Sequence, residues 1–217
     1  MKKTKLIVFS GGCLSGKTTT MLALKAALEK KGLTVDLLNE LMREQGFTSI
    51  DEIRKDPKAY LAMQVKVTTQ KMKQEREAVK SGLDFVLADR SIIDSYFYLL
   101  FYTDKSAYTY DDWATFRGLV SEIEGHIHWS RDNYAHLLFF RPIEEICFDQ
   151  VFRPKHIDLL KYIESEQILS LLRSHYPESF RFMGGPKITI IDLNLNEEFD
   201  LDLMNDIILP MLDLQYK

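Results

Sequence analysis

The most specific chemical motif in the chain is the segment GGCLSGKTT at residues 11–19. It meets the pattern G-x-x-x-x-G-K-[ST] through Gly11, Gly16, Lys17 and Thr18. Glycines let backbone N–H groups surround phosphate oxygens, and the N-terminus of a following helix adds a favourable dipole. In such loops the lysine reaches the β- and γ-phosphates and the threonine hydroxyl ligates Mg²⁺. The motif predicts a triphosphate site formed by Gly11, Gly12, Cys13, Leu14, Ser15, Gly16, Lys17, Thr18 and Thr19.

Two carboxylates follow apolar segments elsewhere in the chain. Asp89 ends the run DFVLAD, where a P-loop protein places a second acidic group near Mg²⁺, so Thr18 and Asp89 are the expected metal ligands. Glu40 ends LTVDLLNE, where a carboxylate can accept a proton from an attacking hydroxyl. The residues alone leave open which carboxylate takes that proton. A strand-terminal salt bridge for Asp89 and a solvated helix start for Glu40 are the structural alternatives.

Further polar side chains could handle a second substrate or the transferred phosphate. Arg90 adjoins Asp89 and suits an anion or an acceptor, whereas Arg43 could steady Glu40 or hold substrate. The amide of Gln64 could contact a base, although a helical glutamine is more often exposed. Arg141 and Arg153 flank a segment that could close over a site and spread positive charge over a phosphoryl group; surface charges are the alternative.

These residues require elements that bring them together. Short apolar runs predict strands at 5–10, 33–40, 84–89, 135–142 and 187–192. Helical patterns cover 18–32, 41–81 with interruptions near Gly46 and Pro57, an aromatic-rich region after 91, 156–176 and 200–214. Strands that alternate with helices indicate an α/β fold with a parallel sheet and helices on both faces. Ligands of such sheets bind beyond the carboxyl ends of the strands, which gathers the loop, Glu40, Asp89 and Arg141 at one crevice.

The bulk composition limits the partners. The 217 residues include 32 acidic and 28 basic side chains, which give a net charge of −4. A protein that binds nucleic acid or anionic membranes non-specifically carries a net positive charge, so the charge does not indicate such a binder. A local basic cleft for nucleic acid is still compatible with this charge. Two cysteines argue against a disulfide framework, and no apolar stretch approaches the ~18 residues of a membrane span. We expect a single cytoplasmic domain over residues 1–217 that does not bind membranes.

With these residues in place, the chain resembles the P-loop kinases of small molecules. It is most similar to the group that contains the nicotinamide riboside kinase domain and related phage proteins. The likeness rests on GGCLSGKTT, LLNELMR, AMQVKVTTQ, VLADRSIIDSYFYL and the segment from FRP to DQVFRP. It implies a P-loop NTPase fold with a five-stranded parallel sheet and a helical lid or substrate region, the lid at about 141–156.

The resemblance also implies roles for individual residues. Glu40 corresponds to the base after the second strand, Gln64 to a base-reading amide, and Asp89, Arg90 and Ser91 to an acidic-Arg-Ser triplet. The chain lacks the proline that often follows the glutamate, and Asp89 replaces a glutamate, as in thymidylate kinases.

The expected function is therefore an ATP- and Mg²⁺-dependent kinase that acts on a nucleoside, a nucleotide or a hydroxylated base. A hydroxymethylated base in phage DNA belongs to this range, because some phage relatives phosphorylate such bases. One alternative is a nucleotide-binding switch or lipid-binding module without kinase turnover. A hydrolytic motor is disfavoured by the short, acidic chain. The choice between ATP and GTP and the oligomeric state stay open.

Overall fold

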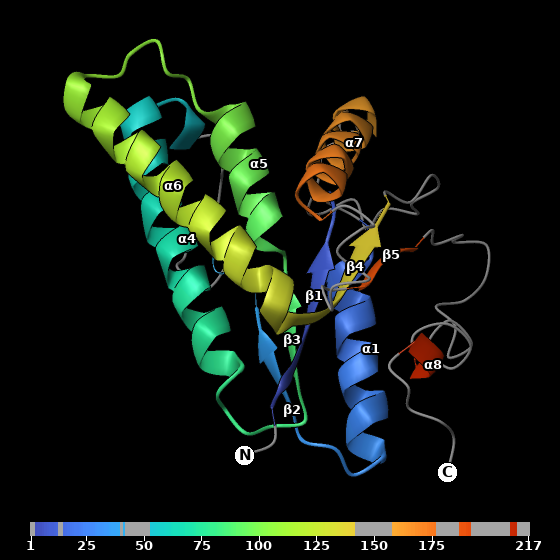
Figure 1. Ribbon diagram of the computed structural model, residues 1–217. Coiled ribbons are helices and arrows are strands. Elements are labelled where there is room, and N and C mark those ends of the chain that lie inside the picture. The colour runs from blue at the N-terminus through green and yellow to red at the C-terminus, as the bar shows by residue number, and fades with distance from the viewer. Residues whose placement is uncertain are drawn as a thin grey trace.

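The computed structural model describes residues 3–12, 15–39, 41, 53–141, 158–176, 187–191 and 209–211. Helices separate successive strands along the chain, as Figure 1 shows. The strands are β1 (Lys5–Ser10), β2 (Val35–Leu38), β3 (Phe85–Asp89), β4 (Tyr134–Phe140) and β5 (Lys187–Ile191). The helices are α1 (Lys17–Lys30), α4 (Pro57–Ala78), α5 (Ile92–Tyr102), α6 (Tyr110–Asn133), α7 (Asp158–His175) and the short α8 (Leu209–Met211).

The strands form one parallel sheet in the order β2-β3-β1-β4-β5. The predicted α/β class, with a parallel sheet between helices, is confirmed. The strand β1, which carries the glycine-rich segment at its end, lies at the centre of the sheet. The strand β3, which ends at Asp89, is its direct neighbour, with Phe9 opposite Asp89. The strand β2 lies one position further out, beside β3.

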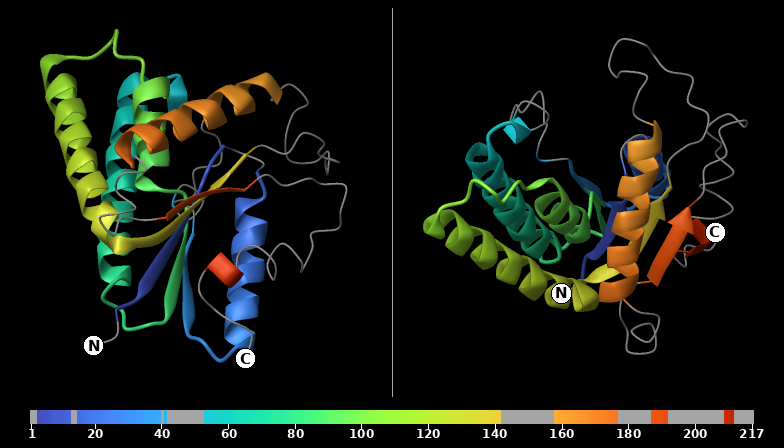
Figure 2. Two further views of the ribbon diagram at one scale, coloured as in Figure 1. Left: turned by 45° about the vertical axis from the view of Figure 1, so that its right-hand side comes forward. Right: turned by 90° about the horizontal axis from the view of Figure 1, so that it is seen from above.

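The two faces of the sheet bury separate sets of side chains because side chains alternate along a strand. Leu6 and Val8 of β1 pack with β3, β4 and helices α4 to α7. Ile7 and Phe9 point to the other face and pack against α1 and Leu209. Figure 2 shows α4, α5 and α6 across the sheet from α1. Covering both faces explains why the strands are continuous apolar runs instead of alternating ones.

Local sequence signals set the starts of the helices. Asp56 caps α4 by accepting hydrogen bonds from the N–H groups of Lys58 and Ala59, and Pro57 occupies the first turn. Ser91 and Thr109 begin α5 and α6 with capping boxes. The aromatic-rich region after residue 91 is therefore two helices, separated at Thr103–Thr109. Of the terminal helix expected at 200–214, the described part is Leu209–Met211.

Within the residues that the structure describes, no helix combines the length and apolarity that spanning a membrane requires.

Candidate active site

The glycine-rich loop joins β1 to α1 at the carboxyl edge of the sheet. Gly16 has a φ of 77° and begins α1 without a side-chain cap, unlike the three helices described above. The uncapped first turn leaves N–H groups available to an anion. The buried ammonium of Lys17 donates to the Gly12 carbonyl at 2.5 Å and to the Ser15 hydroxyl at 3.0 Å. The loop thus concentrates donors and positive charge at one place, as a phosphate site requires.

Gly11 shows why the start of the loop needs glycine. Its φ is 130°, and a Cβ at this position would lie 2.3 Å from the Phe140 carbonyl oxygen at the end of β4. No side chain fits that space, and L residues rarely adopt that φ. The first glycine of the motif is therefore required by the packing of the loop against β4.

Thr18 and Asp89 lie in contact, as their expected shared role requires. The Thr18 hydroxyl donates to Asp89 Oδ2 at 2.9 Å. Asp89 is 5% exposed, and its Oδ1 is buried with no hydrogen-bond partner among the described residues. A buried, unsatisfied carboxylate oxygen beside a hydroxyl is a fitting donor set for Mg²⁺, which binds oxygen ligands. These two side chains would hold the ion.

Arg90 turns the chain sharply after β3. It has a φ of 69°, a left-handed conformation that is unfavourable for an arginine. Its N–H donates to the Phe9 carbonyl at 2.8 Å, which ties the turn to β1. Its guanidinium donates to the Tyr98 hydroxyl at 3.0 Å and lies 5.1 Å from the centre of that ring. Tyr98 thereby fixes the arginine beside Asp89.

A pocket opens next to Asp89, between the sheet edge and helices α4 and α5. The residues that line it are Asn39, Leu41, Tyr60, Gln64, Val67, Lys71, Asp89, Arg90, Ser95 and Tyr98. Gln64 is buried, and its amide donates to the Tyr60 hydroxyl at 2.9 Å, which in turn donates to the Tyr98 carbonyl at 3.0 Å. Burial raises the pKa of Tyr60 to about 12, so this hydroxyl keeps its proton even well above neutral pH. The pocket combines an aromatic wall with an ordered set of polar groups.

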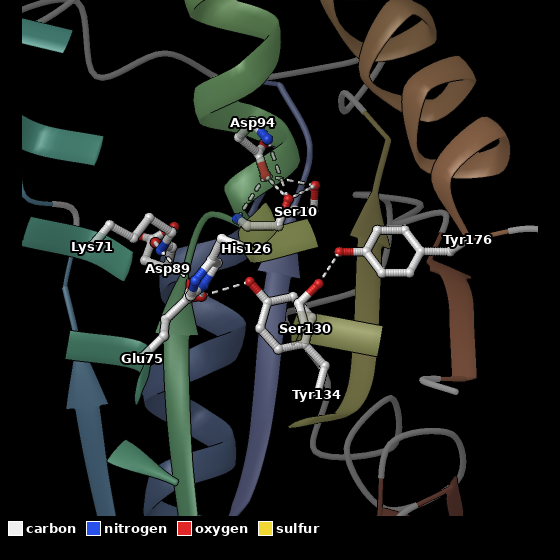
Figure 3. Close-up of polar contacts among 10 residues, drawn as sticks. Ser10, Lys71, Glu75, Asp89, Asp94, His126, Ser130, Tyr134 and Tyr176 are labelled. Atoms are coloured by element: carbon white, nitrogen blue, oxygen red, sulfur yellow. Dashed lines mark hydrogen bonds and ion pairs between the residues drawn. The ribbon is translucent and has the colours of Figure 1, made fainter. Parts of the chain in front are cut away.

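A buried polar network that we did not predict from the sequence extends from the pocket residues Asp89 and Lys71 toward α6 and β4 (Figure 3). Lys71 donates to the Asp89 carbonyl at 3.3 Å and pairs with Glu75 Oε1 at 3.2 Å. Glu75 Oε2 lies 2.7 Å from His126 Nε2 and accepts from the Tyr134 hydroxyl at 2.7 Å. Burial alone would raise the pKa of Glu75, but the Lys71 ammonium and the other partners hold it below its ordinary value. Burial and the Glu75 charge raise the pKa of Tyr134.

A sequence signal for this network exists. Leu61, Gln64, Thr68, Lys71, Glu75 and Ala78 follow one another at intervals of three and four residues, and all six are buried. This spacing marks the inner face of a helix even where the residues are polar.

Several predicted site residues lie outside the described part of the chain. They are Cys13, Leu14, Glu40, Arg43 and Arg153, together with residues 142–156 of the expected lid. Of the others, Thr19 is exposed on the first turn of α1, and Arg141 directly follows β4 at the same sheet edge as Asp89. The structure therefore brings together Gly11, Gly12, Ser15, Gly16, Lys17, Thr18, Asp89, Arg90 and Gln64.

Comparisons with known proteins agree with this geometry. No curated protein matches the sequence. Among solved structures, the fold is similar to that of a NadR protein in complex with NR, with a TM-score of 0.60 and 19% identity. The match covers 91% of this chain and 47% of the NadR chain, so the protein spans about half the length of that structure. A family model described as an AAA domain matches residues 6–178. Because the match covers most of the chain, including the phosphate loop and Asp89, the protein belongs to this family of P-loop proteins.

Proposed function

We propose that the protein is a kinase that uses ATP and Mg²⁺ to phosphorylate a hydroxyl group of a small nucleoside-like acceptor. The observation that carries this proposal is that Asp89 belongs both to the phosphate loop's surroundings and to the neighbouring pocket. Its carboxylate contacts Thr18 of the phosphate loop, and it also lines the neighbouring pocket. A triphosphate on the loop and an acceptor in the pocket would meet at this side chain.

The chemistry of the pocket favours a flat, polar acceptor. Tyr60 and Tyr98 line the pocket with aromatic side chains, and Gln64 offers an amide, a group that pairs with the hydrogen-bonding edge of a base or carboxamide. The NadR protein of similar fold was solved with NR, which supports a nucleoside over a macromolecular acceptor. A nucleotide and a hydroxymethylated base in DNA are the other acceptors to be compared with a nucleoside.

The transfer step needs a charge-stabilising set and a proton acceptor. The acceptor oxygen forms a bond to the γ-phosphorus, the bond to the β–γ bridging oxygen breaks, and ADP leaves. Bound Mg²⁺ would neutralise charge on the phosphate oxygens. Lys17 would stabilise the same charge from the loop, and Arg141 and Arg153 would do so from the expected lid.

The acceptor proton would pass to a carboxylate. Asp89 is one candidate, but its hydrogen bond with Thr18 suits a metal ligand better. Glu40 is the other, because its neighbours in sequence, Asn39 and Leu41, both line the pocket. We assign the proton to Glu40 and the metal to Asp89.

The test is a labelled-phosphate transfer assay. The protein is incubated with Mg²⁺ and ATP labelled at the γ-phosphate, in parallel with labelled GTP. The acceptors are a panel of nucleosides, including nicotinamide riboside, nucleotides, and DNA with or without hydroxymethylated bases. We expect acceptor-dependent transfer to a nucleoside. Nucleotide binding without transfer would favour a switch or a lipid-binding module, and hydrolysis without an acceptor would favour an ATPase; either result overturns the kinase assignment.

A further inference from the structure

Asp94 is a fully buried carboxylate that none of the roles above uses. It lies in the first turn of α5, five residues after Asp89, and is 0% exposed. Burying an unpaired carboxylate is costly, so its partners indicate why it is there. Figure 3 shows it beside Ser10, at the end of β1.

The partners of Asp94 come from two different segments. Its Oδ2 accepts from the Ser10 hydroxyl at 2.7 Å, the Ser91 N–H at 2.7 Å and the Ser91 hydroxyl at 2.5 Å. Its Oδ1 accepts from the Gly11 N–H at 3.1 Å. All four groups are donors, which suits a carboxylate, because an ionised carboxylate only accepts. Two of these donors belong to the end of β1 and the phosphate loop, and two belong to the turn that follows Asp89 and Arg90.

Capping of α5 does not require the contact with the loop. The capping box is complete with the bond from the Ser91 N–H to Asp94 Oδ2 and the bond from the Asp94 N–H to the Ser91 hydroxyl. The Gly11 bond adds nothing to that helix start. Gly11 is also the residue that packs against the Phe140 carbonyl, so Asp94 holds it from the second side.

We propose that Asp94 is a positioning residue for nucleotide binding. It fastens the first glycine of the phosphate loop to the segment that carries Asp89 and Arg90. The loop then has two ties to that segment, Gly11 to Asp94 at its start and Thr18 to Asp89 at its end. Fixed donors bind a phosphate better than mobile ones, because the loop does not lose that freedom on binding. This inference rests on the proposed nucleotide site.

The asymmetry of the contacts allows a selective variant. In Asp94→Asn, the amide oxygen can replace Oδ2, which accepts from three donors, while the NH₂ group then faces the Gly11 N–H. Two donors cannot bond each other, so the contact with the loop is lost first. Ser91→Ala is the matched control, because it weakens the start of α5 and leaves the Gly11 bond intact.

The experiment measures the Kd for MgATP by calorimetry, with the melting temperature of each variant recorded alongside. We expect Asp94→Asn to raise Kd roughly tenfold or more, in proportion to a lost charge-assisted hydrogen bond, and Ser91→Ala to leave it within about threefold. If Asp94→Asn binds MgATP with the same Kd as the wild-type protein, the proposal is overturned. An equal loss of affinity in both variants also overturns it, because the loss would then follow the stability of α5.

A second measurement does not depend on nucleotide or on the folding of Asp94→Asn. Hydrogen exchange of the Gly11 amide, followed by NMR in the wild-type protein, should be slow and should remain slow in Ser91→Ala. Rapid exchange of this amide in the wild-type protein overturns the tie itself. If the wild-type protein bound no nucleotide, the proposed function would fail, whereas a slow Gly11 amide would still establish the contact.

Discussion

The position of Lys17 makes it the residue whose role is most directly tested. Its ammonium donates to Gly12 and Ser15 of its own loop, so its removal should disturb the loop and not the core. Lys17→Ala should lower kcat/KM for transfer by about 10² or more, because the phosphates lose a preorganised charge. Steady-state kinetics and a thermal melt measure the two effects separately.

The matched control is Lys25→Ala on the same helix. Lys25 forms a partly exposed ion pair with Glu29, and such pairs contribute little to stability. It should retain the activity of the wild-type protein. A folded Lys17→Ala variant with full activity would refute the role of the loop.

Asp89 and Glu40 differ in what each should change. Asp89→Asn removes the charge beside Thr18, so the Mg²⁺ concentration for half-maximal activity should rise by at least ~10-fold. Glu40→Gln should leave MgATP affinity near the wild-type value and slow transfer by roughly 10²–10⁴. The loose transition state of phosphoryl transfer favours the lower end of that range. Mg²⁺ titration and single-turnover transfer, measured side by side, separate the two. If Glu40→Gln transfers phosphate at the wild-type rate, Glu40 is not the proton acceptor and Asp89 takes that role.

At the scale of elements, the start of the phosphate loop depends on the end of β4. In Gly11→Ala the new Cβ would lie 2.3 Å from the Phe140 carbonyl oxygen, at a φ of 130°. We expect a loss of about 2–4 kcal/mol in the free energy of unfolding, from strain and overlap together. Urea denaturation measures it.

Gly125 provides the comparison for this substitution. It lies within α6, and a Cβ there would meet no atom within 4 Å beyond its chain neighbours and the backbone of its own helix. Gly125→Ala should therefore stabilise the protein by ~1 kcal/mol, because alanine is the better helix former. Equal stability of the two variants would contradict the packing argument for Gly11.

Glu75 connects α4 to α6 and β4 and makes stability depend on pH. Its pKa in the folded protein is below the ordinary value of 4.5, so its contribution is present above pH 4.5 and is lost as pH falls through the lower, folded pKa. Glu75→Gln should cost about 3 kcal/mol at pH 7, because it leaves the Lys71 charge without its partner. The difference from the wild-type protein should shrink below pH 4.5.

Urea unfolding at pH 7 and in the acid range measures this difference, with Glu77→Gln as the control. Glu77 is on the same helix, but it is exposed and forms only a 4.0 Å pair with Lys73. Its substitution should change stability by less than ~0.5 kcal/mol at either pH. A Glu75→Gln difference that stays constant with pH would contradict the role of the carboxylate.

The helices also show where sequence patterns were sufficient and where they were not. The phosphate loop was predictable because its glycines and lysine are required by ligand geometry, and the parallel strands were predictable because burial on both faces leaves continuous apolar runs. The buried face of α4 was not predicted, although its residues recur at the spacing of an inner helix face. A stripe of Gln64, Thr68, Lys71 and Glu75 has the composition of a solvated face. The burial of its two charged members, Lys71 and Glu75, is explained by partners on α6, β3 and β4, which lie far away in the sequence.

The same limit applies to Asp94 and to the aromatic helix. The S-x-x-D spacing from Ser91 predicts a capping box, but a second use of that carboxylate, toward Gly11, depends on strand order. The aromatic residues of α5 fall on several faces of one helix. Phe97 is in the core, Tyr98 lines the pocket, and Phe101 is 48% exposed. Such assignments follow from neighbouring elements, which a local sequence pattern does not contain.

At the scale of the whole molecule, the candidate site is joined to the strands that hold the fold together. The loop begins at the central strand β1, packs against the end of β4 at Phe140, and contacts β3 through Asp89. A ligand bound there should therefore oppose global unfolding, because these strands separate only when the sheet unfolds. Nucleotide binding should be visible as a change in overall thermal stability.

We expect MgATP to raise the melting temperature of the wild-type protein by about 5–10 °C at a concentration ~100 times its Kd. At that concentration binding adds ~2.7 kcal/mol, and each kcal/mol shifts a domain of this size by roughly 2–4 °C. Differential scanning fluorimetry with MgATP, with ATP plus EDTA, and with MgGTP measures the shift in melting temperature. The three conditions show how the shift depends on the metal ion and on the nucleobase of the triphosphate. Lys17→Ala should lose most of the shift, whereas Lys25→Ala should keep it. A wild-type melting temperature that does not respond to millimolar MgATP or MgGTP would mean that the uncapped start of α1 does not bind a triphosphate. A ligand bound to a loop that contacts the ends of three neighbouring strands must stabilise them.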